Sequence, residues 1–230
     1  MILLGTIVNA AAIVVCSLIG RFLIKGVPKR FEEIIIMAIA LALVYMGITG
    51  AATNERFLLL LGSLIVGCII GEILDIDDGM QRLGTWAEGK FGFSEGDFAK
   101  GFITTSILFC AGSMAILGSL ESGLMGNHEM LFTKSIIDGV VSLIFSSQMG
   151  IGVMFSAVSV FIYQGSITLG ASFVRRWLTT QVITEMSAVG SLLVAAIGFN
   201  FLGTKQIKVA NMIPAIFIPW AFIAIESFFF

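Results

Sequence analysis

Long apolar runs, separated by short clusters of charged and turn residues, are the main pattern of this chain. A membrane-spanning helix needs about 20 mostly apolar residues, and runs of that size follow one another from end to end. We therefore predict an all-α, polytopic integral membrane protein, with residues 1–230 forming a single transmembrane domain of about eight membrane-embedded helical segments. The predicted segments cover residues 2–24, 31–52, 57–74, 101–120, 131–146, 150–173, 181–202 and 207–228.

The stretch 76–98 is the only sizeable region between the predicted spans. Its apolar residues recur at three or four positions, as Ile76, Met80, Leu83 and Phe91 illustrate, with charged residues between them. This spacing predicts a short amphipathic helix that lies on the membrane surface. A helix that docks a partner protein is the alternative.

The stretch 131–174 is predicted to be a central helical hairpin. Its middle, residues 146–152, is rich in serine, glutamine and glycine. Two full helices joined by a tight turn fit this length, and so does a re-entrant pair of shorter helices that meet partway through the membrane. Both arrangements return the chain to the same side.

A weak internal repeat relates two of the predicted spans. Glu33 and Glu185 each begin an apolar run that contains a glycine near its end, Gly47 in one run and Gly198 in the other. This register gives two halves of opposite orientation, an inverted repeat of the kind found in many secondary transporters. A competing register aligns residues 62–66 with 190–194 and makes the halves parallel.

Composition narrows the class of protein. The chain has 57% hydrophobic and 12% charged residues, whereas soluble domains have about 25% charged residues. This composition excludes a soluble enzyme and a disordered regulator. A nucleic-acid binder is excluded as well, since a net charge of −2 offers no basic surface for phosphates. The three cysteines lie in apolar runs and the single histidine, His128, lies in a polar loop, so we expect no metal and no cofactor.

Lysine and arginine are more frequent in the loops on one side of the predicted membrane than in those on the other side. Because cytoplasmic loops are enriched in these residues, we predict that both termini lie outside the cell. The pair Arg175 and Arg176 falls on the outer side and is the exception.

The central sequence FCAGSMAILGSLESGLMGN, followed by KSIIDGVVSLIFSSQMGIGVMFSA and VFIYQGSITL, resembles the bacterial YqgA/YdfK family of uncharacterised membrane proteins, the domain of unknown function DUF554. The segments GTIVNA, TEMSAVGSLLVAAIGFNFL and IKVANMIPA are similar to the family as well, so the resemblance covers nearly the whole chain. It implies a multi-pass protein of the cytoplasmic (inner) membrane of a prokaryote. It implies no activity, so a mechanism has to come from the residues.

Charged residues inside spans are the first candidates for function, because a charge near the bilayer centre costs roughly 2.5–3.5 kcal/mol. Asp138 is the deepest acidic residue, and Lys134 lies one turn before it on the same helix face. The pair is either a structural ion pair or part of a path for a substrate or ion. Glu121, between two glycines, and Glu185, beyond the start of its helix, are further candidates.

Uncharged polar residues extend this set. Interhelical polar contacts in lipid average only about 0.6 kcal/mol, so amides inside spans are better explained by a polar cavity than by packing alone. These candidates are Asn9, Ser147, Gln148, Gln164, Asn200 and Asn211.

We expect a transporter of a small solute or ion, a cation or a cation-coupled solute, that works by alternating access around Asp138 and Gln148. A channel, or a scaffold or sensor that does not transport, is the alternative, and an enzyme is disfavoured because no span contains a histidine or a nucleophile–base motif. The expected partners are the lipid bilayer and the solute. Small residues at four-residue spacing on the first and third spans would suit a homodimer, although packing within one chain is favoured.

Overall fold

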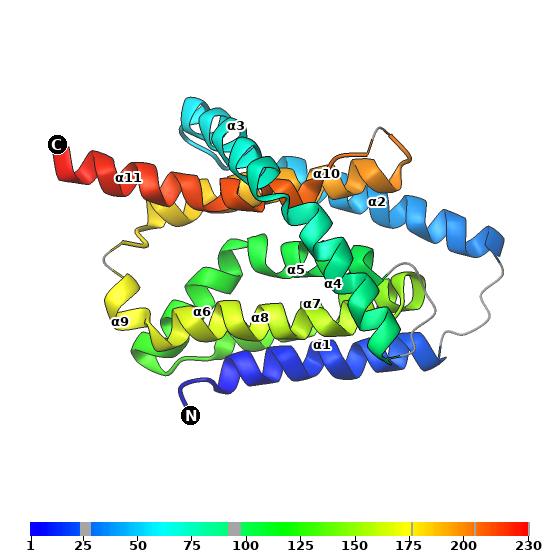
Figure 1. Cartoon of the computed structure of the whole chain (residues 1–230). Coiled ribbons are helices and arrows are strands. Elements are labelled where there is room, and N and C mark those ends of the chain that lie inside the picture. The colour runs from blue at the N-terminus through cyan, green and yellow to red at the C-terminus, as the bar shows by residue number, and fades with distance from the viewer. Residues whose placement is uncertain (24–28, 92–97, 176, 205, 230) are drawn as a thin grey trace. The chain divides into compact units, whose positions relative to one another are not determined.

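The computed structural model describes residues 1–23, 29–91, 98–175, 177–204 and 206–229 (Figure 1). Within these ranges the chain is helical and contains no strand, which confirms the all-α prediction. The helices are α1 (Leu4–Leu23), α2 (Lys29–Ala51), α3 (Phe57–Leu74), α4 (Ile76–Phe91), α5 (Phe98–Ala111), α6 (Ser113–Met125), α7 (Glu129–Met149), α8 (Gly152–Leu169), α9 (Ala171–Val174), α10 (Thr180–Phe201), the 3-10 helix η1 (Val209–Phe217) and α11 (Ile218–Phe229).

Six helical segments of the described chain are long and apolar enough to cross a membrane. The bent pair α5–α6 makes a seventh if it is counted as one span, and the apolar part of α2, Ile36–Ala51, is shorter than the others. The molecule is therefore a membrane protein with six or seven qualifying spans. The count of eight embedded segments stays a prediction.

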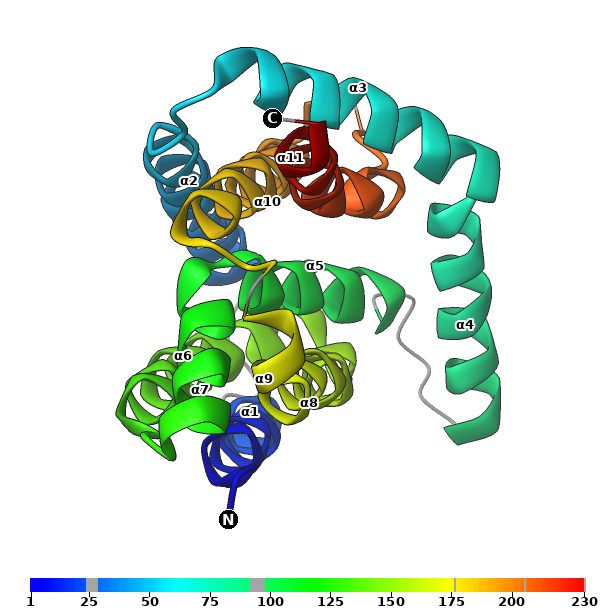
Figure 2. The ribbon, with the colours of Figure 1, turned by 90° about the vertical axis from the view of Figure 1, so that its left-hand side faces the viewer.

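The chain divides into two compact units. Unit 1 contains residues 1–32, 80–110 and 114–174, and unit 2 contains residues 33–79, 111–113 and 175–230. Unit 1 is built on α1, α5, α6, α7 and α8, which Figure 2 shows with α1, α7 and α8 close to end-on. Unit 2 is built on α2, α3, α10, η1 and α11, and each unit is described by itself.

In unit 1, α1 runs parallel to α7 at very short range. A Cβ atom on Gly20 would overlap the carbonyl oxygen of Leu143, and one on Gly5 would lie 2.8 Å from the Leu131 side chain. Cys16 faces Gly139 in the same contact. The small residues of the first span therefore pack against a neighbouring helix of the same chain, which confirms the favoured interpretation of this seam.

The central hairpin consists of two long helices, α7 and α8. They are joined at Gly150, whose φ of 70° suits glycine, and both qualify as membrane spans. This agrees with the first of the two hairpin models. The segment predicted as one span over 101–120 is instead broken, because α5 and α6 meet at an angle of 60°. The Gly112–Ser113 pair lies at the bend, and Gly/Ser pairs are a known cause of kinks.

In unit 2, α2 and α10 are antiparallel and make a reciprocal contact. A Cβ atom on Gly47 would meet Ser191 and Ala195 of α10, and one on Gly198 would meet Ala40 and Val44 of α2. If the sequences of α2 and α10 are aligned so that Gly47 matches Gly198, then Ala40 matches Ser191 and Val44 matches Ala195. The two helices thus use equivalent positions to contact one another.

The helix α3 also packs through small residues. Its Gly67 faces Ala215 of η1 and its Gly71 faces the backbone of Asn211, while Ser63 is fully buried. This seam, like that of α1, is filled by a segment of the same chain.

The last apolar segment starts as η1 and continues as α11. Proline cannot donate the backbone hydrogen bond of a regular α-helix, and Pro214 lies inside η1. Pro219 lies in the first turn of α11, where its missing N–H has no intrahelical acceptor. The helix type thus changes from 3-10 to α in the region of these prolines.

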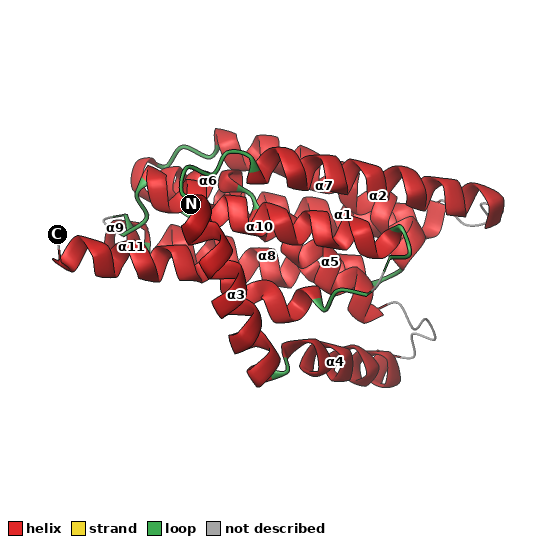
Figure 3. Cartoon of the chain, turned by 90° about the horizontal axis from the view of Figure 1, so that it is seen from above, coloured by secondary structure: helices red, strands yellow, loops and turns green. Residues whose placement is uncertain are grey.

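The stretch 76–98 forms the helix α4 as far as Phe91, as expected from its spacing. Residues 92–97 lie outside the described ranges. The helix α4 follows α3 after the single residue Asp75, and Figure 3 draws the two as consecutive helices. Its position on a membrane surface stays a prediction.

We predict that Gly47→Ala and Gly62→Ala change stability in opposite directions. Alanine at position 47 overlaps α10 and should lower the free energy of unfolding by about 1–3 kcal/mol. Gly62 has nothing within 4 Å of an added Cβ, so alanine there should raise it by up to about 1 kcal/mol through helix propensity. Thermal unfolding in detergent, followed by tryptophan fluorescence, measures both. A Gly47→Ala variant as stable as Gly62→Ala would contradict the close α2–α10 contact.

Candidate functional site

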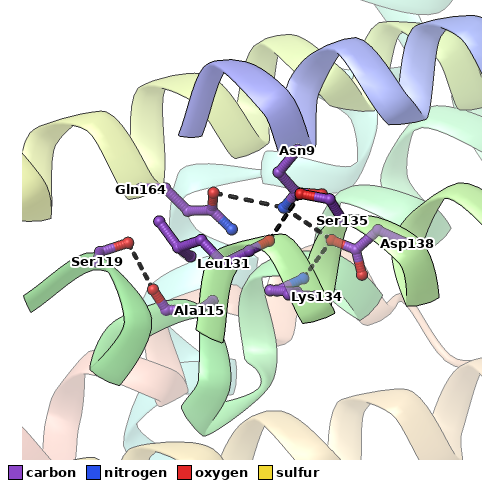
Figure 4. A network of polar contacts seen from close by, with 8 residues as sticks. All are labelled: Asn9, Ala115, Ser119, Leu131, Lys134, Ser135, Asp138 and Gln164. Carbon is purple, nitrogen blue, oxygen red and sulfur yellow. Dashed lines mark hydrogen bonds and ion pairs between the residues drawn. The ribbon is translucent and has the colours of Figure 1, made fainter. Parts of the chain in front are cut away.

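A buried ion pair lies at the centre of unit 1 (Figure 4). Lys134 and Asp138 are one turn apart on α7 and are only 6% and 4% exposed. The Lys134 Nζ atom donates to the Asp138 Oδ2 atom. Two charges removed from water in this way are tolerated only as a pair with further hydrogen bonds.

Asn9 of α1 and Gln164 of α8 complete this polar cluster, and both are fully buried. The Asn9 Nδ2 atom donates to Asp138 Oδ2 at 3.0 Å and to Gln164 Oε1 at 3.4 Å. A carboxylate only accepts hydrogen bonds, so Asp138 fixes which end of the Asn9 amide faces it. Asn9 Oδ1 and Gln164 Nε2 are then left without a protein partner.

Two threonines extend the cluster toward the start of α1. Thr6 lies three residues before Asn9, and Thr168 lies four residues after Gln164, so each shares a helix face with its amide. Both are buried, and their hydroxyl oxygens have no hydrogen-bond partner. The α1–α8 interface thus carries two successive polar levels, one of threonines and one of amides.

The next level of α1, α5 and α8 is apolar. Ile13, Phe109, Ala157 and Val160 form one buried group, which we call the apolar layer. Ile13 follows Asn9 by one turn of α1, and Val160 precedes Gln164 by one turn of α8. The Lys134 Nζ atom lies 5.6 Å from the centre of the Phe109 ring, a cation–π contact.

Polar groups return beyond the apolar layer. Ser146 of α7 donates to the Ser17 carbonyl oxygen of α1 at 2.9 Å, and the Ser17 and Ser142 hydroxyls are buried without a partner. On α1, Asn9 and Ser17 therefore lie on opposite sides of the apolar layer, whereas Ser142 follows Asp138 by one turn on the same face of α7. In the described part of the chain, no three His, Cys, Asp or Glu side chains come together in a way that could hold a metal ion.

Four of the predicted site residues are thus brought together: Asn9, Lys134, Asp138 and Gln164. Gln148 is not close to Asp138, because it lies ten residues further along α7, about 15 Å along the axis. There its Nε2 atom donates to Ser147 Oγ at 3.4 Å, and Ser147 Oγ donates to the Ile144 carbonyl. Gln164, which Asn9 links to Asp138, is the glutamine of this cluster.

Glu121 is half-buried on α6. The glycines on either side of it serve helix packing. A Cβ on Gly118 would lie 2.9 Å from the Leu131 side chain, and one on Gly123 would overlap the Thr168 carbonyl oxygen. Next to it, Ser122 Oγ donates to the Ile2 carbonyl at 2.9 Å and contacts His128 Nδ1.

The three predicted residues of unit 2 each bind backbone. Glu185 is fully buried and accepts from the Glu55 N–H at 3.0 Å, which holds the loop between α2 and α3. Asn200 makes two 2.8 Å bonds to the backbone of Ile207 and so closes the loop before η1. Asn211 accepts from the Asp77 N–H at 2.7 Å and donates to Glu72.

Two further ion pairs lie nearer the surface. Arg56 pairs with Glu226 at 2.6 Å, and the hydrogen bond from this carboxylate raises the pKa of the Arg56 guanidinium. Lys208 pairs with Glu72 at 3.3 Å, and this hydrogen bond raises the pKa of the Lys208 ammonium. These partly exposed pairs contrast with the sealed pair of unit 1.

Sequence reasoning missed Thr6, Thr168 and Phe109. The threonines share helix faces with Asn9 and Gln164, so the spacing of polar residues could have identified them. The contact between Phe109 and Lys134 joins α5 to α7 and depends on how the helices pack, so no local signal in the sequence indicates it.

Comparisons with known proteins agree with this description. The family model described as a protein of unknown function (DUF554) matches residues 4–224. The uncharacterized membrane protein YdfK of Bacillus subtilis (strain 168) is 33% identical over 219 residues, which cover 94% of this chain and 93% of YdfK. The uncharacterized protein YqgA of Escherichia coli (strain K12) is 27% identical over 218 residues, with 93% of each chain covered. No solved structure matches.

We predict that neutralising either member of the buried pair is far more damaging than neutralising both. Lys134→Met or Asp138→Asn alone strands a buried charge and should lower the free energy of unfolding by about 3–5 kcal/mol. The double variant should recover to within about 1 kcal/mol of the wild type, since exchanging a whole buried pair for neutral groups is often nearly neutral. Chemical denaturation of the purified protein in detergent micelles measures this cycle.

The partly exposed pair provides the control. Glu226→Gln should change stability far less than either single variant of the buried pair, because water screens the pair of Arg56 and Glu226. Equal losses at Asp138 and Glu226 would contradict the sealed position of the unit 1 pair.

Proposed function

The chain belongs to the DUF554 family of membrane proteins of unknown function, and on this premise we propose that it is a transporter of a small solute or ion, a cation or a cation-coupled solute, which works by alternating access around Asp138. We place it in the cytoplasmic (inner) membrane of a prokaryote, with both termini outside. The proposal is for a transporter and not for an enzyme, and it rests on unit 1.

The observation that carries the proposal is the pair of unpartnered amide atoms beside the buried ion pair. Asn9 Oδ1 and Gln164 Nε2 are fully buried and unsatisfied, one as an acceptor and one as a donor. A purely structural polar network is stable when every member is satisfied, and a partly satisfied one costs free energy. Unsatisfied groups at this depth are explained if water or a solute binds there during the working cycle.

The apolar layer favours an alternating-access mechanism and argues against an open channel. A pore needs a continuous wet path, and apolar constrictions block conduction by excluding water. Here the apolar layer, with Ile13 between Asn9 and Ser17 on α1, separates the Asn9 and Gln164 amides from the Ser17 hydroxyl. A barrier on one side of a binding cluster is the arrangement that an alternating mechanism requires of each end state.

The reciprocal contact of unit 2 supports the inverted repeat that the sequence predicts. Two antiparallel helices that contact each other through equivalent positions are related by a pseudo-two-fold axis, as inverted repeats are. The pairs Gly47–Ala195 and Gly198–Val44 follow this rule. They favour the register that aligns α2 with α10 over the competing register with α3.

We predict that single cysteines on the two sides of the apolar layer react from opposite sides of the membrane. In a background with Cys16, Cys68 and Cys110 replaced by serine, Thr6→Cys and Ser17→Cys each provide one thiol. In sealed proteoliposomes, a membrane-impermeant maleimide should label each of them from one side only. Ile13→Cys, in the apolar layer, should be labelled more slowly than either.

The outcomes separate the candidate functions. Labelling of both positions from both sides at once would indicate a channel, and no labelling of either would indicate a scaffold; both results contradict the proposal. Uptake of radiolabelled sodium, rubidium and small amino acids then tests transport itself. Asp138→Asn should abolish any uptake found, while the exposed Glu33→Gln should leave it unchanged.

A further inference from the structure

We propose that the cation taken up at this site is a proton, bound by the carboxylate of Asp138, and that it arrives through the polar levels of the α1–α8 interface. This inference rests on the proposed function and deepens it, because it names the ion to which transport is coupled. Four features of unit 1 lead to it.

The first feature is the set of groups around the carboxylate. The Asp138 Oδ2 atom accepts from Lys134 Nζ and from Asn9 Nδ2, which are both donors. Metal cations such as calcium need several oxygen ligands, whereas the closest groups here carry hydrogens and, in Lys134, a positive charge. A proton needs one lone pair and no cage of ligands. The donor set therefore favours a proton over a metal cation.

The second feature is the row of unsatisfied groups that leads to Asp138. Thr6 and Thr168 form the outer level, and Asn9 and Gln164 form the inner one, with each residue at most 2% exposed. Buried polar atoms without a protein partner are normally bonded to internal water. Water and hydroxyl groups pass protons along hydrogen bonds, so this row provides a path from the start of α1.

The third feature is the dry barrier beyond the carboxylate. The side chains of the apolar layer come from α1, α5 and α8 and carry no hydrogen-bonding group. They give a proton that reaches Asp138 along the threonine side no path of side chains toward Ser17 in this conformation. Coupled transport requires such a barrier, because a proton that crossed the protein without a conformational change would not drive the transport of a solute.

The fourth feature is the change in charge when the proton binds. The pair of Lys134 and Asp138 is neutral overall; protonation converts the carboxylate to a carboxylic acid and breaks the ion pair. The Lys134 ammonium keeps its charge and its contact with Phe109. The site thus has a neutral form and a form with one positive charge, and these two forms can favour different helix arrangements.

The titratable groups near Asp138 come from four helices. Lys134 lies on α7, and Cys16 of α1 lies 3.1 Å from the position of a Cβ on Gly139. Cys110 of α5 is within electrostatic reach of both Lys134 and Asp138, and Tyr163 of α8 is within reach of Cys110. All variants of the proton measurement are made in the background in which Cys16, Cys68 and Cys110 are serine, so that the thiols do not contribute.

The test introduces a hydroxyl group into the apolar layer so that water can enter it. It then measures whether protons cross the protein by way of Asp138. Val160→Ser places a hydroxyl in the layer, while the control Val158→Ser lies two residues away on the same helix at a position 55% exposed. The purified chain is reconstituted in phospholipid vesicles that contain a pH-sensitive dye, and a potassium gradient with valinomycin provides the driving force. Sodium uptake is measured in the same vesicles at constant pH.

We expect Val160→Ser to admit protons several-fold faster than the wild type and Val158→Ser, without admitting sodium. Adding Asp138→Asn to Val160→Ser should abolish this leak. If that variant does not fold, the version that also carries Lys134→Met replaces it, since the neutral pair is expected to fold. A leak that survives the loss of Asp138, a leak of sodium, or no leak would each overturn the proton assignment.

These failures are distinct from failure of the transporter itself. If the proton assignment is wrong but the protein is a transporter, Thr6→Cys and Ser17→Cys still react from opposite sides of the membrane. If the transporter proposal is wrong, that accessibility pattern is lost whatever the proton measurements give.

Discussion

The close approach of α1 to α7 is the constraint on which the interior of unit 1 depends. A charged pair inside a membrane protein is tolerated only where neighbouring helices cover it completely. Gly5, Gly20 and Gly139 remove side chains from this interface, so the two backbones come near enough to enclose Lys134 and Asp138. The same contact brings Asn9 within 3.0 Å of the carboxylate. Glycines, which have no functional group of their own, thus determine where a buried polar cluster can form in unit 1.

Unit 2 shows a different use of buried polar groups. Glu185, Asn200 and Asn211 all bind backbone N–H or carbonyl groups at the ends of helices. Such groups cannot be left unsatisfied near lipid. An amide or a carboxylate side chain can bond to them at a helix end, where the intrahelical hydrogen bonds stop. These three residues therefore order the loops of unit 2, whereas Asn9 and Gln164 of unit 1 each leave one buried atom without a protein partner.

Much of this could be predicted from the sequence, because hydropathy and the cost of buried charge act locally. The predicted runs correspond to the helices, the small-residue seams of α1 and α3 pack within the chain, and Asp138 with Lys134 forms the deepest ion pair. The sequence did not predict the bend between α5 and α6 or the pairing of Asp138 with Asn9 and Gln164. Both depend on contacts between helices far apart in the chain. Gln148 was chosen by its polarity alone, and polarity does not indicate whether a residue lies close to Asp138 in the folded protein.

The 3-10 helix η1 has a consequence for length. A 3-10 helix rises about 2.0 Å per residue and an α-helix about 1.5 Å, so the nine residues of η1 extend about 18 Å instead of about 13.5 Å. This gain lets a short segment, Val209–Glu226, match the thickness of a hydrocarbon core near 30 Å. If η1 were to rewind as an α-helix, the segment would shorten by about 4.5 Å. Asn211, which is bonded to Glu72 and Asp77, would then carry the junction of α3 and α4 along the axis of η1.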